Sequence, residues 1–378
     1  MFAGFEYYPL YLGVMLLLIL GKTLFKGPDG LIVGSDRLSF LKGLFLCIFF
    51  IFFFGFRPSG QYFPDTHVFK TTYENVLYYG IDHQGRGDIL YDMLINACAA
   101  LRLNVETYFC IVAAFYMLPI LLGARILFPG REYLALLFFC ISFAFYSGGG
   151  TIIRNGVACS FEFLGIALWY RSNSNIKNRI LSIIVLLAGC YLHNSAFILA
   201  LSFVLSLLFI RNVKWSLIIW IGAILLALII GRELGFLISE YIDDDRLQSY
   251  AEAGMDLSNF EGFSYSGFRW DFLSYSILGI IMIWYVRFKK HIINSYFNLL
   301  SNTYIISNAI WILFIYSSFS DRFARLSWSL LPFIFFFPLV KFNIWRKPNT
   351  ATAAILFGQW IFLLVMGIGS LIFFFSFI

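Results

Sequence analysis

The sequence predicts an all-α integral membrane protein with about twelve transmembrane helices. Of its 378 residues, 60% are hydrophobic and only 13% are charged, whereas about 25% are charged in soluble domains. The apolar residues also come in stretches close to the roughly 20 residues that a helix needs to cross a bilayer. Basic residues gather in alternate loops, as they do on the cytoplasmic side of membrane proteins. We therefore expect a single transmembrane domain over residues 1–378.

Charged breaks divide the chain into the expected spans. The first is a retained helix, because Glu6 precedes its apolar run and Lys22 follows it, the reverse of a signal peptide. The stretch 180–210 is too long for one crossing and is interrupted between Tyr191 and Ser195, so we expect two helices that meet there. In order, the spans lie near residues 5–21, 38–56, 106–127, 132–147, 150–170, 180–192, 195–210, 215–231, 271–287, 299–317, 324–340 and 351–376.

Two long segments separate the spans on the outer side. Residues 57–105 end in a moderately apolar stretch that carries Asp92 and Asn96, which predicts an amphipathic helix at the membrane interface. Residues 232–270 form the second segment, and its run Asp243 to Asp245 is interpreted as a solvated loop or, alternatively, a cation site. Loops longer than about 12–15 residues are usually functional or disordered, so the working face is expected to be the outer one.

The charges predict the orientation. With both termini outside, most of the 27 Lys and Arg lie in or beside inner loops, and most of the 21 Asp and Glu lie outside or within spans. The net charge of +6 therefore reflects the cytoplasmic ends of helices, and no nucleic-acid partner is expected. Of the aromatic residues, the 46 Phe suit lipid-facing surface, and the 22 Tyr and 9 Trp suit the headgroup belts.

The sequence lacks the common signatures of cofactor chemistry. No phosphate-loop pattern is present, since the glycine run 148–150 has neither the lysine nor the strand that such a loop requires. No HExxH pattern or His/Cys cluster indicates a catalytic metal, and the six cysteines are scattered through apolar stretches. We expect no cofactor.

Four arginines occur at the outer ends of spans, the side that is normally poor in cations: Arg57, Arg154, Arg322 and Arg325. Arginine binds phosphate oxygens bidentately, so this group predicts a site for an anionic lipid headgroup such as a diphosphate. The alternative is that these side chains only extend to the headgroup layer. Glu162, two turns deeper than Arg154, is a supporting candidate because an ionisable group inside a span is costly.

Two residues near these arginines are candidate general bases. His193 lies at the break between two spans, and Asp65 follows Arg57 in the first outer segment. The alternative roles are a helix cap for His193 and, for Asp65, a cap on a helix that begins at Thr66. Asn194 and Asp321, each next to a candidate, are assigned supporting roles.

In these motifs the chain resembles the bacterial polysaccharide repeat-unit polymerases of the Wzy and EpsG type, over residues of about 50 to 340. Where that family often has a Gly-Asp-Tyr run, this chain has Pro64-Asp65-Thr66. The matching features are Phe56-Arg57 followed by Asp65-Thr66, the run Ile153 to Ala158, the run Tyr191 to Ala196, and the late pair Arg322 and Arg325.

The resemblance implies a fold similar to the GT-C-like lipid-linked glycosyltransferases and a glycosyl transfer without metal or nucleotide. The donor would be a growing glycan on undecaprenyl diphosphate, and the acceptor a lipid-linked repeat unit, at the outer face of the bacterial cytoplasmic membrane. The arginines would hold the diphosphate, and His193 or Asp65 would take the acceptor proton. The product would be O-antigen, capsule or exopolysaccharide, with a chain-length regulator and a flippase as candidate partners.

Two other classes remain as alternatives. A transporter or flippase of lipid-linked oligosaccharide would show internal repeats and polar groups near the midplane, and neither is evident in the sequence. A membrane acyltransferase would need a site that a cytoplasmic acyl donor reaches, whereas His193 is expected outside.

Overall fold

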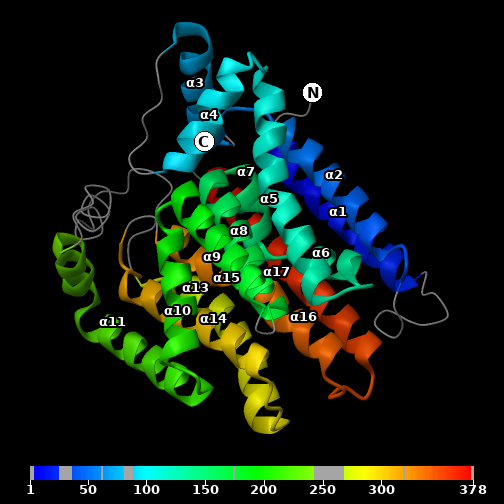
Figure 1. Cartoon of the computed structure of the whole chain (residues 1–378), viewed down its shortest axis with the longest axis vertical. Helices are drawn as coiled ribbons and strands as arrows, with labels where there is room; N and C mark the ends of the chain where they lie inside the picture. Colours follow the sequence, from blue (N-terminus) through cyan, green and yellow to red (C-terminus); the bar gives the residue numbers. More distant parts are fainter. Residues whose placement is uncertain are drawn as a thin grey trace. The chain divides into compact units, whose positions relative to one another are not determined.

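The computed structural model describes residues 4–24, 36–60, 63–80, 88–172, 175–241, 268–317 and 320–375. Within these ranges all regular elements are helices, and the only extended pairing is one isolated bridge between Gly60 and Phe63 (Figure 1). The predicted all-α class is confirmed.

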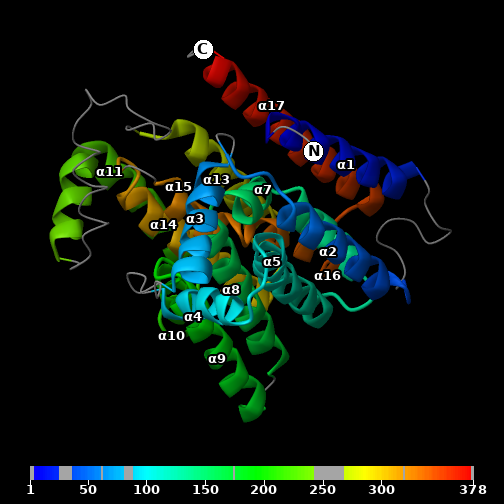
Figure 2. The same cartoon turned by 90° about the horizontal axis from the view of Figure 1, so that it is seen from above.

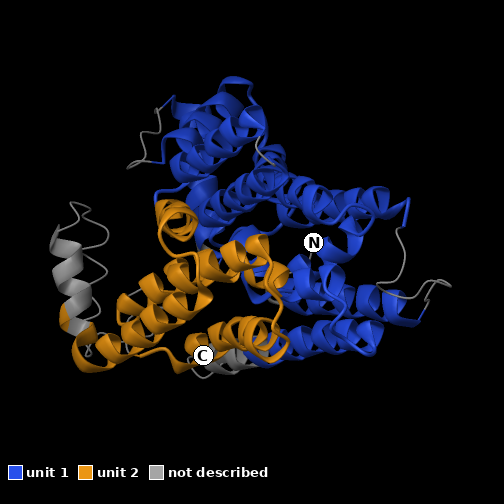
Figure 3. Cartoon of the chain, turned by 60° about the horizontal axis from the view of Figure 1, so that its bottom comes forward, with its two compact units in different colours: residues 1–194, 335–378 blue, residues 195–334 orange. Residues whose placement is uncertain are grey.

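The chain forms two compact units, residues 1–194 with 335–378 and residues 195–334 (Figure 3). The predicted single transmembrane domain stays a prediction. The first unit contains α1 (Gly4–Leu24), α2 (Ser39–Gly55), α3 (Pro64–Tyr79), α4 (Ile89–Ala100), α5 (Val105–Leu127), α6 (Glu132–Cys140), α7 (Phe143–Gly150), α8 (Ile153–Arg171), α9 (Ile176–Leu192) and α17 (Pro348–Phe375). The second contains α10 (Ala196–Leu208), α11 (Val213–Tyr241), α13 (Trp270–Trp284) with η1 (Tyr285–Lys289), α14 (Ser295–Leu313) and α15 (Asp321–Trp328), and α16 (Leu331–Lys341) starts in the second unit and ends in the first.

The chain is a polytopic membrane protein. Six segments of the described residues are long and apolar enough to cross a bilayer, and the pair α6 and α7 passes the same test together. Other apolar helices, such as α2 and α10, are shorter. The count of about twelve spans stays a prediction. The six segments are Glu6–Leu24, Val105–Leu127, Val213–Gly231, Trp270–Lys289, Asp321–Lys341 and Pro348–Met366.

Helices α1, α2 and α5 lie side by side, with their ends at the same two levels. Near the start of α1, the Tyr7 hydroxyl donates to the Phe53 carbonyl near the end of α2. At the end of α5, the guanidinium of Arg125 lies 4.1 Å from the ring centroid of Phe40 at the start of α2. Helix α2 is therefore antiparallel to α1 and α5, and the basic residues that charge counting assigns to the cytoplasm gather at one end of these helices. On the other side of α1 packs α17, whose Trp360 indole donates to the Leu12 carbonyl at 2.9 Å (Figure 2).

The segment expected to be a straight span at 132–147 is instead broken, since α6 and α7 meet at 79°. The pair still runs the length of α2. At its start, the backbone N–H of Tyr133 donates to Ser39 Oγ at the first residue of α2 (3.1 Å). At its end, the Gly150 carbonyl accepts from Thr66, beyond the last turn of α2 (2.9 Å).

Tyrosine hydroxyls donate to one carbonyl at the break and to another inside α7. Tyr11 of α1 donates to the Cys140 carbonyl at 2.5 Å, and Tyr116 of α5 donates to the Phe145 carbonyl at 3.1 Å. A backbone group without a partner is costly in an apolar interior, so the bond from Tyr11 to the Cys140 carbonyl stabilises the bend. Tyr11 is fully buried, unlike the headgroup position that the sequence suggested for tyrosine.

The expected break at 191–195 is confirmed, because α9 ends at Leu192 and α10 begins at Ala196. In the first outer segment, α3 begins at Pro64, so Asp65 lies inside the first turn and the suggested cap at Asp65 is wrong. Helix α4 is formed as expected, and its location at the interface stays a prediction. Of the second outer segment, residues 242–267, including Asp243 to Asp245, lie outside the described residues.

The second unit is organised around α14, which carries fully buried polar side chains. The side-chain amide of Asn308 donates to Ser276 Oγ of α13 (2.9 Å) and to Ser327 Oγ of α15 (3.0 Å), and its oxygen accepts from the Trp220 indole of α11 (2.8 Å). One amide therefore joins α11, α13 and α15 to α14, and so holds α15 in place within its unit.

Candidate functional site

A buried carboxylate, Asp88, joins three parts of the first unit. It lies directly before α4, and its side chain is 0% exposed. Its Oδ2 accepts from Arg154 Nη1 at 2.5 Å, and its Oδ1 from His193 Nδ1 and from the backbone N–H of Asn194, both at 3.1 Å. We call these four residues the Asp88 site.

Local structure places each member of the site. Helix α8 begins at Ile153, so Arg154 lies in its first turn. Helix α9 ends at Leu192, and His193 is its C-cap with extended backbone (φ −160°, ψ 123°), so the chain leaves the helix axis at His193. Because α8 and α9 pack along each other, the start of one lies near the end of the other, where Asp88 meets both.

The triple-glycine run and Gly156 allow α7 and α8 to approach closely. A Cβ on Gly156 would overlap the Gly148 carbonyl, and a Cβ on Gly149 would overlap the Phe54 ring unless that ring moved. The run 148–150 is therefore a packing element that fixes the start of α8, and with it Arg154.

The electrostatics favour an ionised Asp88. Burial raises the pKa of its carboxyl, but the hydrogen bond and charge of His193, the charge of Arg154 and the Asn194 N–H outweigh burial, so the pKa lies below its ordinary value. The Arg154 guanidinium also lies 5.2 Å from the ring centroid of Phe69 on α3. The side chains of Arg154 and His193 are 25% and 13% exposed, so both are accessible, whereas the Asp88 carboxylate is fully buried.

This arrangement supports two kinds of chemistry. A carboxylate that accepts from Nδ1–H holds an imidazole in the tautomer whose Nε2 can take a proton, as in general-base catalysis. A partly exposed guanidinium has five N–H donors, more than one carboxylate oxygen uses, and is suited to phosphate oxygens.

Arg57 is used inside the protein. It is 5% exposed, its Nε donates to Thr66 Oγ1 at 2.8 Å, and its Nη1 donates to the Phe54 carbonyl at 2.5 Å. Its guanidinium lies 4.3 Å from the Phe109 ring centroid, and Thr66 in turn donates to the Gly150 carbonyl. Arg57 therefore links the ends of α2 and α7 to the start of α3.

Arg322 and Arg325 belong to the second unit, and both lie on α15 as their spacing predicted. Within that helix, Arg325 Nη2 donates to Asp321 Oδ2 at 3.1 Å. Asp321 thus pairs with an arginine, and its supporting role stays a prediction.

The other two candidates lie elsewhere in the first unit. Asp65 is in the first turn of α3, one turn before Phe69, and so on the helix side that faces Arg154. Glu162 is fully buried against α9, where the Cys190 thiol donates to its Oε1 at 3.5 Å. A Cβ on Gly189 would lie 2.6 Å from that oxygen, so Gly189 makes room for the carboxyl.

Sequence reasoning missed Asp88, the residue on which the site is centred. Its pairing partners lie 66 and 105 positions away in the chain, and no local pattern shows such contacts. The one available signal was its position directly before the apolar stretch that starts at Ile89, where Asp is favoured as a helix N-cap.

Among the described residues, no three side chains of His, Cys, Asp or Glu gather as a metal site would require. The model of the EpsG family matches residues 41–377, which include every residue of the Asp88 site and all four predicted arginines. Neither a curated protein nor a solved structure matches the chain.

Proposed function

The chain belongs to the EpsG family, and from this premise we propose that it is a polysaccharide polymerase that works on lipid-linked glycans. It transfers a growing glycan from undecaprenyl diphosphate onto a lipid-linked repeat unit at the outer face of the bacterial cytoplasmic membrane. The observation that supports this proposal best is the shared carboxylate of Asp88, which brings a candidate base and a candidate anion ligand to one place.

In the proposed reaction, His193 is the general base. Asp88 holds its Nδ1–H, and Nε2 takes the proton from the acceptor hydroxyl as that oxygen bonds to the anomeric carbon of the donor sugar. The bond between this carbon and the diphosphate oxygen breaks, and the electron pair leaves with the polyprenyl diphosphate. Asp88 stabilises the imidazolium that forms.

Arg154 binds the leaving diphosphate in this proposal. The guanidinium is partly exposed beside the buried carboxylate, so it can offer donors to phosphate while Asp88 holds it in position. The charge that develops on the leaving oxygen is thereby stabilised without a metal or a nucleotide.

The remaining candidates take different parts. Arg57 acts as a positioning residue, because its N–H groups bond Thr66 and the Phe54 carbonyl and not an open site. Arg322 and Arg325 stay predicted diphosphate ligands on the strength of the sequence, and Asp65 stays the alternative base.

The test compares Asp88→Asn with Glu74→Gln, a carboxyl-to-amide change on α3 in a surface pair with Lys70 (3.8 Å). We expect Asp88→Asn to lower the transfer rate by about 10²–10⁴-fold, since the imidazole loses its orienting carboxylate. Single repeat units then accumulate on lipid, while Glu74→Gln makes chains of normal length. The readout is the profile of lipid-linked glycans in cells that express equal amounts of each variant.

Other outcomes would point to other assignments. If Asp88→Asn made long glycan chains and Asp65→Asn did not, the role of general base would be assigned to Asp65. Accumulation of repeat units on the cytoplasmic face alone would contradict polymerisation and favour a flippase, which acts before the outer face is reached.

A further inference from the structure

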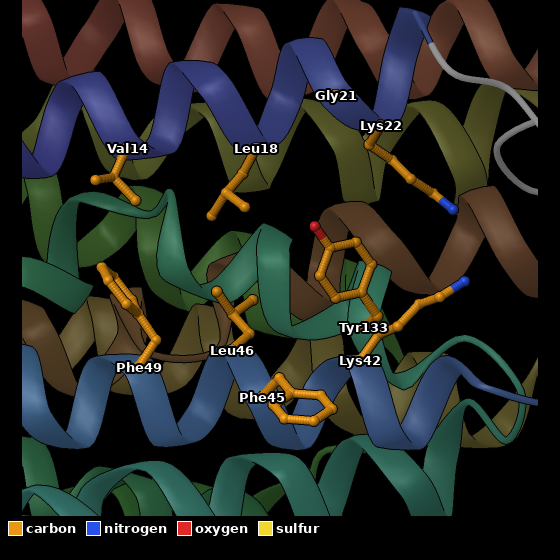
Figure 4. Close-up of a pocket in the computed structure, with 9 residues that line it drawn as sticks. All are labelled: Val14, Leu18, Gly21, Lys22, Lys42, Phe45, Leu46, Phe49 and Tyr133. Carbon is orange, nitrogen blue, oxygen red and sulfur yellow. The ribbon is translucent and has the colours of Figure 1, made fainter.

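A groove between α1, α2 and α6 lies away from the Asp88 site, within the first unit. Its walls are apolar, with Val14 and Leu18 from α1 and Leu46 and Phe49 from α2 (Figure 4). Its cavity volume is about 540 Å³, and a Cβ built on Gly21 at its edge meets no described atom within 4 Å.

Two lysines stand at one end of this groove. Figure 4 shows the side chains of Lys22 and Lys42 extending in the same direction from α1 and α2, on either side of Tyr133. Lys42 pairs with Asp36 at 2.6 Å, and the Lys22 ammonium lies 5.9 Å from the Tyr133 ring centroid. The residues that line the groove include these two cations and no carboxylate, so its end favours an anion.

The dimensions of the groove match one leaflet of a bilayer. From Lys22 to Val14 the helix rises about 12 Å at 1.5 Å per residue. Half of the roughly 30 Å hydrocarbon core is about 15 Å. An acyl chain that enters beside the lysines would therefore lie along the apolar walls for most of its leaflet.

The end of the groove is also the right one for such a lipid. Because α1 and α2 are antiparallel, Lys22 and Lys42 lie at the end opposite to Arg57, which follows the last turn of α2. Charge counting assigns this basic end to the cytoplasm, where anionic lipids meet juxtamembrane basic residues.

We propose that this groove binds an anionic phospholipid of the cytoplasmic leaflet, with its phosphate between Lys22 and Lys42 and one acyl chain along Leu18 and Phe49. The site is independent of the proposed glycosyl transfer. It ties α1 to α2 on the side of the membrane where no catalytic group is placed.

The test is a titration of the purified full-length protein with phosphatidylglycerol or with phosphatidylcholine of identical acyl chains. Binding is read from the rise in melting temperature, followed by tryptophan fluorescence. We expect phosphatidylglycerol to raise the melting temperature and to bind about fivefold more weakly for each lysine removed, so about 25-fold more weakly to the double variant Lys22→Gln, Lys42→Gln. The matched control Lys177→Gln, an exposed lysine at the start of α9, should bind as the wild type does.

Two further arms test the acyl chain and the headgroup separately. Leu18→Trp fills the groove and leaves both lysines, and it should lose the response to phosphatidylglycerol while melting at the wild-type temperature without lipid. Inorganic phosphate alone should give no shift. Equal responses to the two lipids, an equal response of the double variant, or a full response to inorganic phosphate would each overturn the proposal.

Discussion

Asp88 is the acceptor for an arginine, a histidine and a backbone N–H, so one carboxylate determines the geometry of three groups. Such a carboxylate is stabilised in its charged form, in agreement with the direction of its pKa. Hydrogen bonds to an ionised carboxylate are stronger than those to a neutral one, so protonation of Asp88 would weaken its hold on these neighbours. The protonation state of Asp88 therefore matters for both stability and activity.

A pH dependence of stability follows. Because the pKa of Asp88 is lowered in the folded state, its contribution is present above the pKa of an unfolded Asp, about 3.9, and is lost as the pH falls through the folded pKa. We expect Asp88→Asn to be less stable than the wild type by roughly 3 kcal/mol at neutral pH, as for a broken buried pair. The difference should stay constant down to about pH 5 and shrink below about 3.9.

Thermal unfolding of both proteins in detergent across this range measures that difference. A stability difference between the two proteins that does not change in acid would show that the ion pair is not its origin. Glu74→Gln, a surface change, should give parallel curves at every pH.

At this scale the sequence predicted the cations better than their partner. Arg154 stood out because cations are unusual at the outer ends of spans, and His193 because it lies at a break between two spans. Asp88 lies in a polar outer segment, where a carboxylate costs nothing, and only the folded chain shows that it is buried. The internal role of Arg57 was hidden for the same reason, since its partner Thr66 looked like any outer hydroxyl.

Among the elements, the contact of α7 with α8 depends on glycine. The Gly148 carbonyl lies where a Cβ of Gly156 would be, and backbone atoms cannot move aside as a flexible side chain can. This contact also sets the first turn of α8, which carries Arg154.

We therefore expect Gly156→Ala to destabilise the protein by about 1–3 kcal/mol, the usual range for overpacking. Gly13→Ala in α1 is the matched control, because its Cβ would meet no described atom within 4 Å. Alanine favours helix over glycine by up to about 1 kcal/mol, so this control should be neutral or slightly stabilising. The melting temperatures of the two variants test this prediction, and equal values would contradict the packing argument.

The sequence predicted one break between helices and missed another. The break between α9 and α10 was visible because Tyr191 to Ser195 interrupts a stretch that is too long for one crossing. The break between α6 and α7 has no proline and lies within a stretch of ordinary span length. The carbonyl at this break is bonded by a donor from α1, which a local pattern cannot show.

For the whole molecule, the two-sided distribution of charge was the strongest prediction from the sequence. The antiparallel packing of α1, α2 and α5 gathers their predicted cytoplasmic cations at one end. Which side of the membrane that end faces rests on the positive-inside rule. The number of spans was harder to predict, because short and bent apolar helices do not fit a fixed length.

Cysteine labelling tests the orientation. Thr71 on α3 and Lys177 on α9 are exposed and lie at opposite ends of the predicted topology. An impermeant maleimide should label Thr71→Cys in intact cells and Lys177→Cys only after the membrane is opened. The native background should be low, since five of the six cysteines are buried. The reverse pattern would invert the topology and place the Asp88 site in the cytoplasm.

The hydroxyls of Tyr11 and Tyr116 donate hydrogen bonds to the bent pair α6 and α7, a stabilising contribution that a hydropathy scale does not include. The Tyr11 hydroxyl does for the Cys140 carbonyl what a water molecule does at a break in a soluble helix, and both residues are fully buried. By ordinary substitution scales, phenylalanine is the mildest replacement for tyrosine in an apolar protein. At Tyr11 that exchange would remove the hydroxyl that donates to the Cys140 carbonyl and put no other donor in its place, so a variant that looks more suited to the membrane would fit this fold less well.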